Sequence, residues 1–177
     1  MRQSFAALVL VLIGCIARAQ APAPADAVSF VNEGTVNAPI EDVWRVWSTS
    51  DGYKAVGVAL ADVDLRIGGM IRSRYSADGS LGNPQTIENE ILAYEPPRMI
   101  AFRIHKTPAG FPFKDAWKHT WTVVTLTPLD GGRTQVRAAS LGYGPDPESQ
   151  AMRRFFERGN DQTLKALTSY FEGRRGQ

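Results

Sequence analysis

The stretch DPESQAMRRFFERGNDQTLKALTSYF, residues 146–171, predicts one long helix near the end of the chain. Asp146 suits an N-cap, Pro147 the first helical position, and Glu148 the first turn, where the helix dipole favours a carboxylate. Gly173 is the expected stop. A wide apolar stripe along this helix needs a surface to cover it. The stripe consists of Met152, Phe155, Phe156, Gly159, Thr163, Leu164, Leu167, Tyr170 and Phe171.

The residues before this helix supply that surface as a series of strands. Alternation predicts a first strand at 28–36. Pro39 and the two carboxylates after it predict a helix that ends near 50–52, and 53–58 suits a second short helix. Turn signals then separate six more strands, with a loop at 107–116. The six strands are 61–66, 70–75, 86–94, 99–106, 117–127 and 133–141. This order predicts an α+β domain in which a helix covers one face of an antiparallel sheet.

Four short motifs resemble those of a known superfamily. They are Val36-Asn37-Ala38-Pro39 followed by Val43-Trp44, then Asp64-Leu65-Arg66-Ile67-Gly68-Gly69, Glu95-Pro96-Pro97-Arg98 and Gly131-Gly132-Arg133-Thr134. In order and spacing, from about residue 28 to 171, the chain resembles the START-like superfamily (SRPBCC, or Bet v-like helix-grip), and within it the activators of heat-shock-protein ATPase. The resemblance implies a helix-grip fold, a curved antiparallel β-sheet wrapped around a long C-terminal α-helix.

The same resemblance implies a cavity between sheet and helix that receives lipids, polyketides, sterols or aromatic compounds. It implies no particular reaction, because the fold hosts carriers, cyclases, hydrolases and regulators alike.

The first nineteen residues predict an export signal. Arg2 precedes an apolar run at 5–16, and Ala17-Arg18-Ala19 suits cleavage after Ala19. We expect an Ala/Pro-rich linker at 20–27, one domain at 28–173, a tail at 174–177, and a periplasmic or secreted protein. Leu12-Ile13-Gly14-Cys15 also resembles a lipobox, so a lipid anchor at Cys15 is the alternative. In either case we discount activation of an intracellular chaperone.

Charge and cysteine content exclude several functions. The chain has 20 Lys and Arg residues against 18 Asp and Glu residues. Arg2 and Arg18 belong to the leader, so the mature chain has no net charge and gives no basis for nucleic-acid binding. Cys15 is the only cysteine, which leaves no disulfide or thiolate chemistry after cleavage. The chain has no nucleophile elbow to supply a nucleophile with its base and no phosphate-cradling glycine loop. We predict no cofactor.

Two histidines and two tryptophans are the first candidates for a ligand site. His105 is expected on one central strand, and Trp117, His119 and Trp121 on another. Unbroken alternation back from Val124 would turn Trp121 and His119 outward, whereas a β-bulge would turn them inward. We favour the inward arrangement; an exposed aromatic patch for a partner is the alternative. Two histidines alone predict no metal site.

Further candidates lie on other elements of the domain. Tyr75 and Asn89 are expected to point into the cavity. Glu88 and Glu90 would pair with Arg72 and Arg74 across the wet face of the sheet. In the long helix Phe155 and Phe156 could line the cavity, and Gly159 would accept a helix-interior cost of about 1 kcal/mol in exchange for space.

Three functions follow from these features. We favour a non-catalytic protein, monomer or homodimer, that binds a small hydrophobic or aromatic ligand, with no catalytic residue assigned and membrane contact only through a lipidated Cys15. The second is a cyclase- or hydrolase-like enzyme that uses His105 or His119 with Tyr75 or Asn89. The third is an envelope interaction module, which a filled interior would favour.

Overall fold

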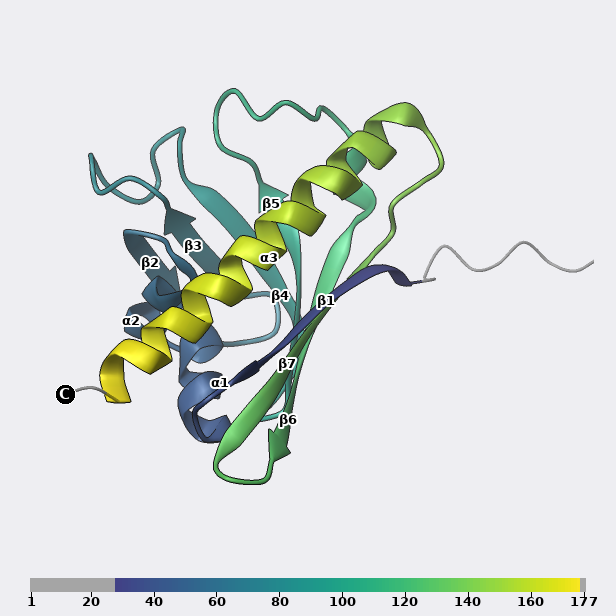
Figure 1. Ribbon diagram of the computed structural model, residues 1–177. Helices are drawn as coiled ribbons and strands as arrows, with labels where there is room; N and C mark the ends of the chain where they lie inside the picture. Colours follow the sequence, from purple (N-terminus) through teal and green to yellow (C-terminus); the bar gives the residue numbers. More distant parts are fainter. Residues whose placement is uncertain (1–27, 176–177) are drawn as a thin grey trace, which may run out of the picture.

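A seven-stranded antiparallel sheet and one long helix dominate the computed structural model, which describes residues 28–175 (Figure 1). The strands lie in the order β1-β7-β6-β5-β4-β3-β2. Their bounds are β1 Val28–Val36, β2 Leu60–Val63, β3 Met70–Arg74, β4 Ile87–Glu95, β5 Met99–Lys106, β6 Trp121–Leu129 and β7 Arg133–Leu141. The expected helix-grip fold is confirmed.

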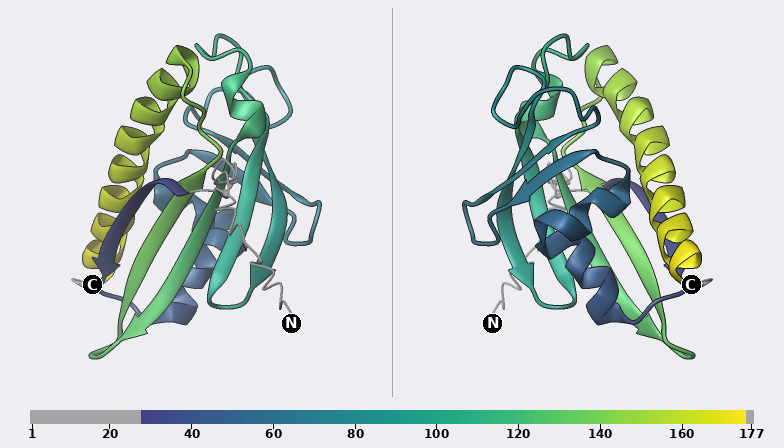
Figure 2. Two further views of the ribbon diagram at one scale, coloured as in Figure 1. Left: turned by 90° about the vertical axis from the view of Figure 1, so that its right-hand side faces the viewer. Right: turned by 90° about the vertical axis from the view of Figure 1, so that its left-hand side faces the viewer.

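The helices differ greatly in length. They are α1 Ile40–Ser48, α2 Ser50–Tyr53 and α3 Pro147–Arg175, with short 3-10 helices η1 Lys54–Val56 and η2 Ala116–His119. In Figure 1, α3 crosses the sheet diagonally, and the side views of Figure 2 place it along one side of the curved strands. None of the helices within 28–175 is long and apolar enough to cross a membrane.

The core lies at one end of the domain, where α1 packs against the sheet. Val43, Trp44, Val46 and Trp47 of α1 are all buried because apolar residues recur at helical spacing. Leu167 and Phe171 bring the C-terminal half of α3 into the same cluster. At the other end of α3 only Met152 and Ser149 are fully covered, so the middle of the helix stands over a space that the core does not fill.

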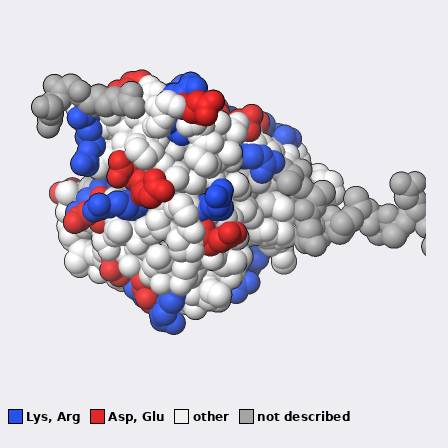
Figure 3. Space-filling view, turned by 90° about the horizontal axis from the view of Figure 1, so that it is seen from below, with Lys and Arg blue, Asp and Glu red and all other residues white. Residues whose placement is uncertain are grey.

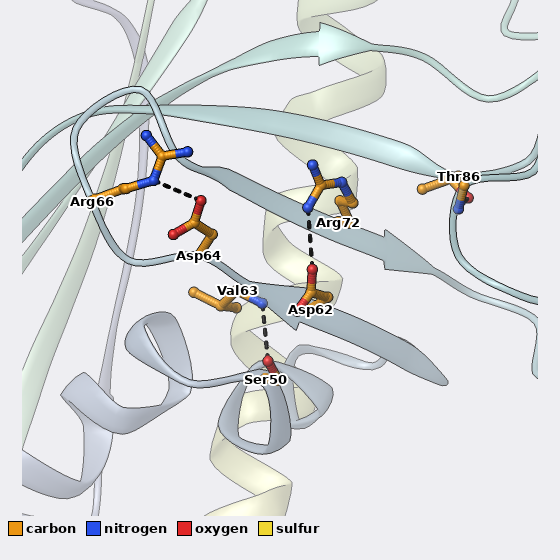
Figure 4. A network of polar contacts seen from close by, with 8 residues as sticks. Ser50, Asp62, Val63, Asp64, Arg66, Arg72 and Thr86 are labelled. Carbon is orange, nitrogen blue, oxygen red and sulfur yellow. Dashed lines mark hydrogen bonds and ion pairs between the residues drawn. The ribbon is translucent and has the colours of Figure 1, made fainter.

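Local hydrogen bonds fix the helices to the sheet. The Ser50 hydroxyl accepts the Val63 N–H at 3.0 Å and so ties α2 to β2 (Figure 4). The Asn32 amide of β1 donates to Glu157 O at 3.0 Å and to Asp161 Oδ1 at 2.6 Å, both on α3.

Most strand bounds agree with the expected ones within one residue, but the strand expected at 61–66 is Leu60–Val63, and the short helix expected at 53–58 is α2 and η1, which end at Val56. The strand expected at 117–127 begins only at Trp121, because Ala116–His119 form a turn of 3-10 helix. Lys118 N–H donates to Asp115 O at 3.0 Å and Thr120 Oγ1 to Trp117 O at 3.0 Å, which closes that turn. The long helix passes Gly173 and continues to Arg175. The leader, Cys15 and the linker lie outside the described residues.

Candidate functional site

The space under α3 is a pocket of about 1020 Å³ between the sheet and the helix. Pockets of roughly 300–1,000 Å³ enclose drug-sized molecules, so this one has room for a ligand of that size. It arises where the sheet opens, because β5 pairs with β6 only over Met99–Phe102. Exposed Tyr75 and Phe155 are among its lining residues, which places part of its wall at the protein surface.

Most of the pocket wall is apolar. Ile87, Phe102, Ile104 and Val124 line it from the sheet. The α3 side contributes Phe156, Gly159, Leu164 and Ala166. A Cβ added at Gly159 would meet no heavy atom within 4 Å. The glycine therefore faces open space and does not serve close packing of the helix.

Some of the polar side chains in this wall are buried. Trp47, Tyr53 and Asn89 are only 5%, 7% and 8% exposed, and all three line the pocket. The Trp47 and Tyr53 rings meet edge-on with centroids 6.1 Å apart. The indole Nε1 of Trp47 has no hydrogen-bond partner among the described residues. Burial raises the pKa of Tyr53 well above its usual range, with a smaller contribution from Tyr75, so its hydroxyl stays protonated at neutral pH.

The charged residues that line the pocket are all arginines: Arg74, Arg103 and Arg158, with no Asp, Glu, Lys or His. Arg103 pairs with Glu90 at 2.8 Å. Arg74 is 6% exposed and lies under the loop that follows β3, where it donates to Ser80 O at 3.4 Å. A Cβ added at Gly79 would lie 2.8 Å from its Nη1, so this arginine holds the loop in place.

Four phenylalanine rings form an aromatic cluster beside the pocket, defined as Phe111, Phe113, Phe155 and Phe156. The ring centroid of Phe111 lies 6.1 Å from that of Phe155 and 6.2 Å from that of Phe156. The ring centroids of Phe113 and Phe155 are 5.7 Å apart. The carboxylate of Glu148, in the first turn of α3, accepts the backbone N–H groups of Lys114 and Asp115. The loop that carries Phe111 is thereby held against the helix.

The residues predicted for the site divide into two groups. Six line the pocket: Tyr75, Asn89, Trp121, Phe155, Phe156 and Gly159. Their contact with a ligand stays a prediction. His105, Trp117 and His119 are not among the lining residues, and the expectation that they face the cavity is wrong.

The physical reasons for these corrections are local. The register of β6 with β7 runs unbroken from Trp121 to Leu129, so no bulge reverses the alternation. Thr120, Thr122 and Val124 accordingly line the pocket, and Trp121, the first residue of β6, contributes to its wall as well. The 3-10 turn before β6 leaves His119 exposed.

Trp117 and His105 lie outside the pocket for separate reasons. The half-buried Trp117 donates from Nε1 to Lys114 O at 3.1 Å, with Lys118 Nζ 5.9 Å from its ring. His105 alternates with the pocket residue Ile104 and is exposed.

The ion pairs on the outer face differ from those expected. Glu88 pairs with Lys106 at 3.4 Å and Glu90 with Arg103, both across β4 and β5. Arg72 pairs instead with Asp62 of β2 at 3.2 Å, and Arg66 with Asp64 at 2.9 Å (Figure 4). The face seen in Figure 3 carries positive and negative side chains side by side, without a patch of one sign.

This arrangement suits binding better than the acid–base chemistry considered from the sequence. The histidines of that hypothesis do not line the pocket that Tyr75 and Asn89 line. Within residues 28–175 no group of three His, Cys, Asp or Glu side chains could hold a metal ion. The sequence had also not singled out Trp47 or Tyr53; Trp47 gave only the signal of an apolar helical stripe.

Comparisons with solved structures support the architecture. A crystal structure of protein NE0264 from Nitrosomonas europaea is similar with a TM-score of 0.60 at 16% identity, covering 84% of this chain and 96% of that one. The solution structure of the Aha1 dimer from Colwellia psychrerythraea gives 0.60 at 14% identity, covering 81% and 95%. An HSP90 activator from Plasmodium falciparum gives 0.51 at 14% identity, covering 73% and 87%. At these identities the likeness shows the fold alone.

Comparison with curated proteins finds no match. The family model described as activator of Hsp90 ATPase homolog 1-like protein matches residues 37–172. That range begins just before α1 and ends within α3, so it includes the pocket and all but one of the sheet's strands. The chain therefore belongs to the family of activator of Hsp90 ATPase homolog 1-like proteins.

Proposed function

We propose that this protein is an exported binding protein that holds a small, largely apolar or aromatic molecule in the pocket between the sheet and α3. The observation that carries the proposal is the pocket itself, about 1020 Å³ with a mostly apolar wall. An apolar ligand in this pocket would cover the apolar wall and remove it from water, which favours binding.

Gly159 supports the same proposal from the helix side. A glycine inside a helix costs about 1 kcal/mol relative to alanine, and no neighbouring atom requires its small size. A glycine at this position is explained if a ligand occupies the open space next to it. An interaction module with a filled interior accounts for neither the glycine nor the pocket.

The place of action that we propose is the cell envelope. This part of the proposal rests on the leader, with its apolar run and the possible cleavage after Ala19 or lipidation at Cys15. We expect a monomer or a homodimer; the Aha1 protein of Colwellia psychrerythraea is described as a dimer. Light scattering after size exclusion distinguishes the two states.

A fluorescent probe tests the binding proposal. N-phenyl-1-naphthylamine, a neutral aromatic amine that fluoresces in apolar surroundings, is titrated into protein from which bound lipid has been extracted. We expect saturable binding of one probe per chain. Gly159→Phe places a ring in the pocket and should weaken binding at least tenfold.

Gly173→Phe is the matched control. It adds the same ring to the same helix at an exposed glycine that also has no heavy atom within 4 Å of an added Cβ and does not line the pocket. It should bind the probe like the parent protein. A parent protein that shows no saturable binding, or equal weakening by both variants, contradicts the proposal.

A further inference from the structure

Several buried side chains of the pocket wall carry hydrogen-bond donors that have no acceptor among residues 28–175. Trp47 Nε1 is one such donor, and Arg74 Nε, under the loop after β3, is another. Among the hydrogen bonds of residues 28–175, none involves the hydroxyl of Tyr53 or the side-chain amide of Asn89, although both residues are more than nine-tenths buried. Buried polar groups normally find partners, because an unmade hydrogen bond leaves the cost of desolvation uncompensated.

Of these donors, Trp47 and Tyr53 lie in ring contact, and Asn89 belongs to the half of the sheet to which α2 is tied. Tyr53 ends α2, which Ser50 ties to the edge strand β2. Its ring meets that of Trp47 on α1. Asn89 lies on β4, two strands in from β2, opposite Ile71 of β3. These three donors thus come from α1, α2 and β4, whereas the aromatic cluster belongs to α3 and the loop before β6.

The charge of the wall agrees with an acceptor there. A carboxylate side chain among the lining residues would repel an electron-rich oxygen, and the lining has none; of its three arginines, Arg103 is already paired with Glu90. An acceptor oxygen would therefore find donors without meeting a like charge.

We infer that the bound molecule carries a hydrogen-bond-accepting oxygen, of the carbonyl or carboxylate kind, at the end that lies against Tyr53, Asn89 and Trp47, with its apolar body under α3. This inference deepens the proposed function and rests on it.

Two probes of nearly the same shape isolate the oxygen. 2-Acetylnaphthalene, the ketone, has a carbonyl oxygen where 2-isopropenylnaphthalene, the hydrocarbon, has a methylene group. Each is used to displace N-phenyl-1-naphthylamine, and the quantity compared is the ratio of their dissociation constants, hydrocarbon over ketone. Tyr53→Phe removes only a hydroxyl and should lower this ratio about fivefold, as expected for one net hydrogen bond.

Control variants separate this effect from general loosening. Tyr94→Phe removes a hydroxyl that does not line the pocket, and Trp44→Phe changes a buried tryptophan of α1 that does not line it either. Both should leave the ratio unchanged, whereas Asn89→Leu should lower it like Tyr53→Phe.

A spectroscopic readout reports the Trp47 indole directly. The chain has four tryptophans, and the Trp47 Nε1–H signal in a ¹H–¹⁵N correlation spectrum is identified by its loss in Trp47→Phe. We expect the ketone to move this signal downfield and the hydrocarbon to leave it nearly in place. Equal shifts with both probes, together with an unchanged ratio in every variant, overturn the inference.

Failure of the inference and failure of the proposed function are distinguishable. If N-phenyl-1-naphthylamine binds but neither naphthalene displaces it, the oxygen inference falls and the binding function stands. If the fluorescent probe itself does not bind, both fall.

Discussion

Gly159→Ala should stabilise the protein, which is the opposite of what most substitutions in a folded domain do. Alanine is favoured over glycine inside a helix by about 0.8–1.0 kcal/mol. The new methyl group would meet no heavy atom within 4 Å, so no clash offsets that gain. We therefore expect the free energy of unfolding to rise by about 1 kcal/mol and the melting temperature to rise by about 3 °C.

The assay is equilibrium unfolding in urea, followed by circular dichroism, with a thermal melt as a second measurement. Gly142→Ala provides a control of opposite sign. Gly142 has a φ of +83°, and an added Cβ would lie 1.9 Å from the carbonyl oxygen of His119. That variant should lose stability, because both the backbone conformation and the space require glycine.

A destabilised Gly159→Ala protein would refute the reasoning. It would mean that the helix at this point packs against something, and that the pocket under it is smaller than described. We expect Gly159→Ala to be more stable than the parent and to keep its ligand affinity, and Gly159→Phe to lose that affinity. Together these results would show that the glycine lowers stability and leaves room for a ligand.

Three further predictions concern the aromatic cluster, the bond from β1 to the long helix, and the helix cap. Phe111→Ala should speed dissociation of N-phenyl-1-naphthylamine about three- to tenfold in stopped-flow fluorescence, because its ring contacts two rings of α3 and lines the pocket; an unchanged rate would mean that the Phe111 ring does not hold the ligand in place. Asn32→Leu should cost about 1–3 kcal/mol in urea unfolding, because both hydrogen bonds from β1 to α3 are lost; a cost near zero would mean that this anchor is unimportant. Hydrogen bonds from the hydroxyl and backbone N–H of Ser149 hold the pKa of Asp146 below its usual value of 3.8. The stability from this cap is therefore present above about pH 4 and lost as the pH falls through the lowered folded-state pKa. Between pH 5 and pH 3 the melting temperature of Asp146→Asn should fall less than that of the parent protein. Equal decreases would contradict the role of the cap.

The fold was predictable because its signals are periodic or local. Alternation identified the strands, with β1, β5 and β7 at their observed bounds, and Asp146 and Pro147 marked the start of the long helix. The positions of Asn89 and Gly159 in the pocket wall followed from strand alternation and from the apolar stripe of α3.

The errors arose where tertiary contacts overrode local pattern. Thr, Val and Trp are common in strands, so residues 117–120 seemed to extend β6. The hydrogen bonds of Asp115 and Thr120, and the Glu148 carboxylate reaching from α3, bend that segment into a 3-10 turn instead. No local sequence pattern predicts a contact with a helix that begins more than thirty residues later. Because of this contact and the turn that it stabilises, His119 points outward.

The donors of the pocket wall were hidden for another reason. Trp47 belongs to an apolar helical stripe and looks like plain core; only the three-dimensional arrangement shows that its indole nitrogen lacks a partner. The role of Arg74 was also not visible, because alternation gave it an exposed face that the loop after β3 covers.

Native mass spectrometry of the protein, purified gently from its own envelope fraction, tests the central claim most directly. We predict a complex heavier than the chain by the mass of one small molecule, lost on denaturation, whose identified structure has an apolar body and an acceptor oxygen. The denatured mass also shows whether the chain begins at Gln20 or at a lipidated Cys15. A mass equal to the bare chain, unchanged after addition of a panel of lipids and aromatic compounds, would contradict the claim that the pocket between the sheet and α3 binds such a ligand.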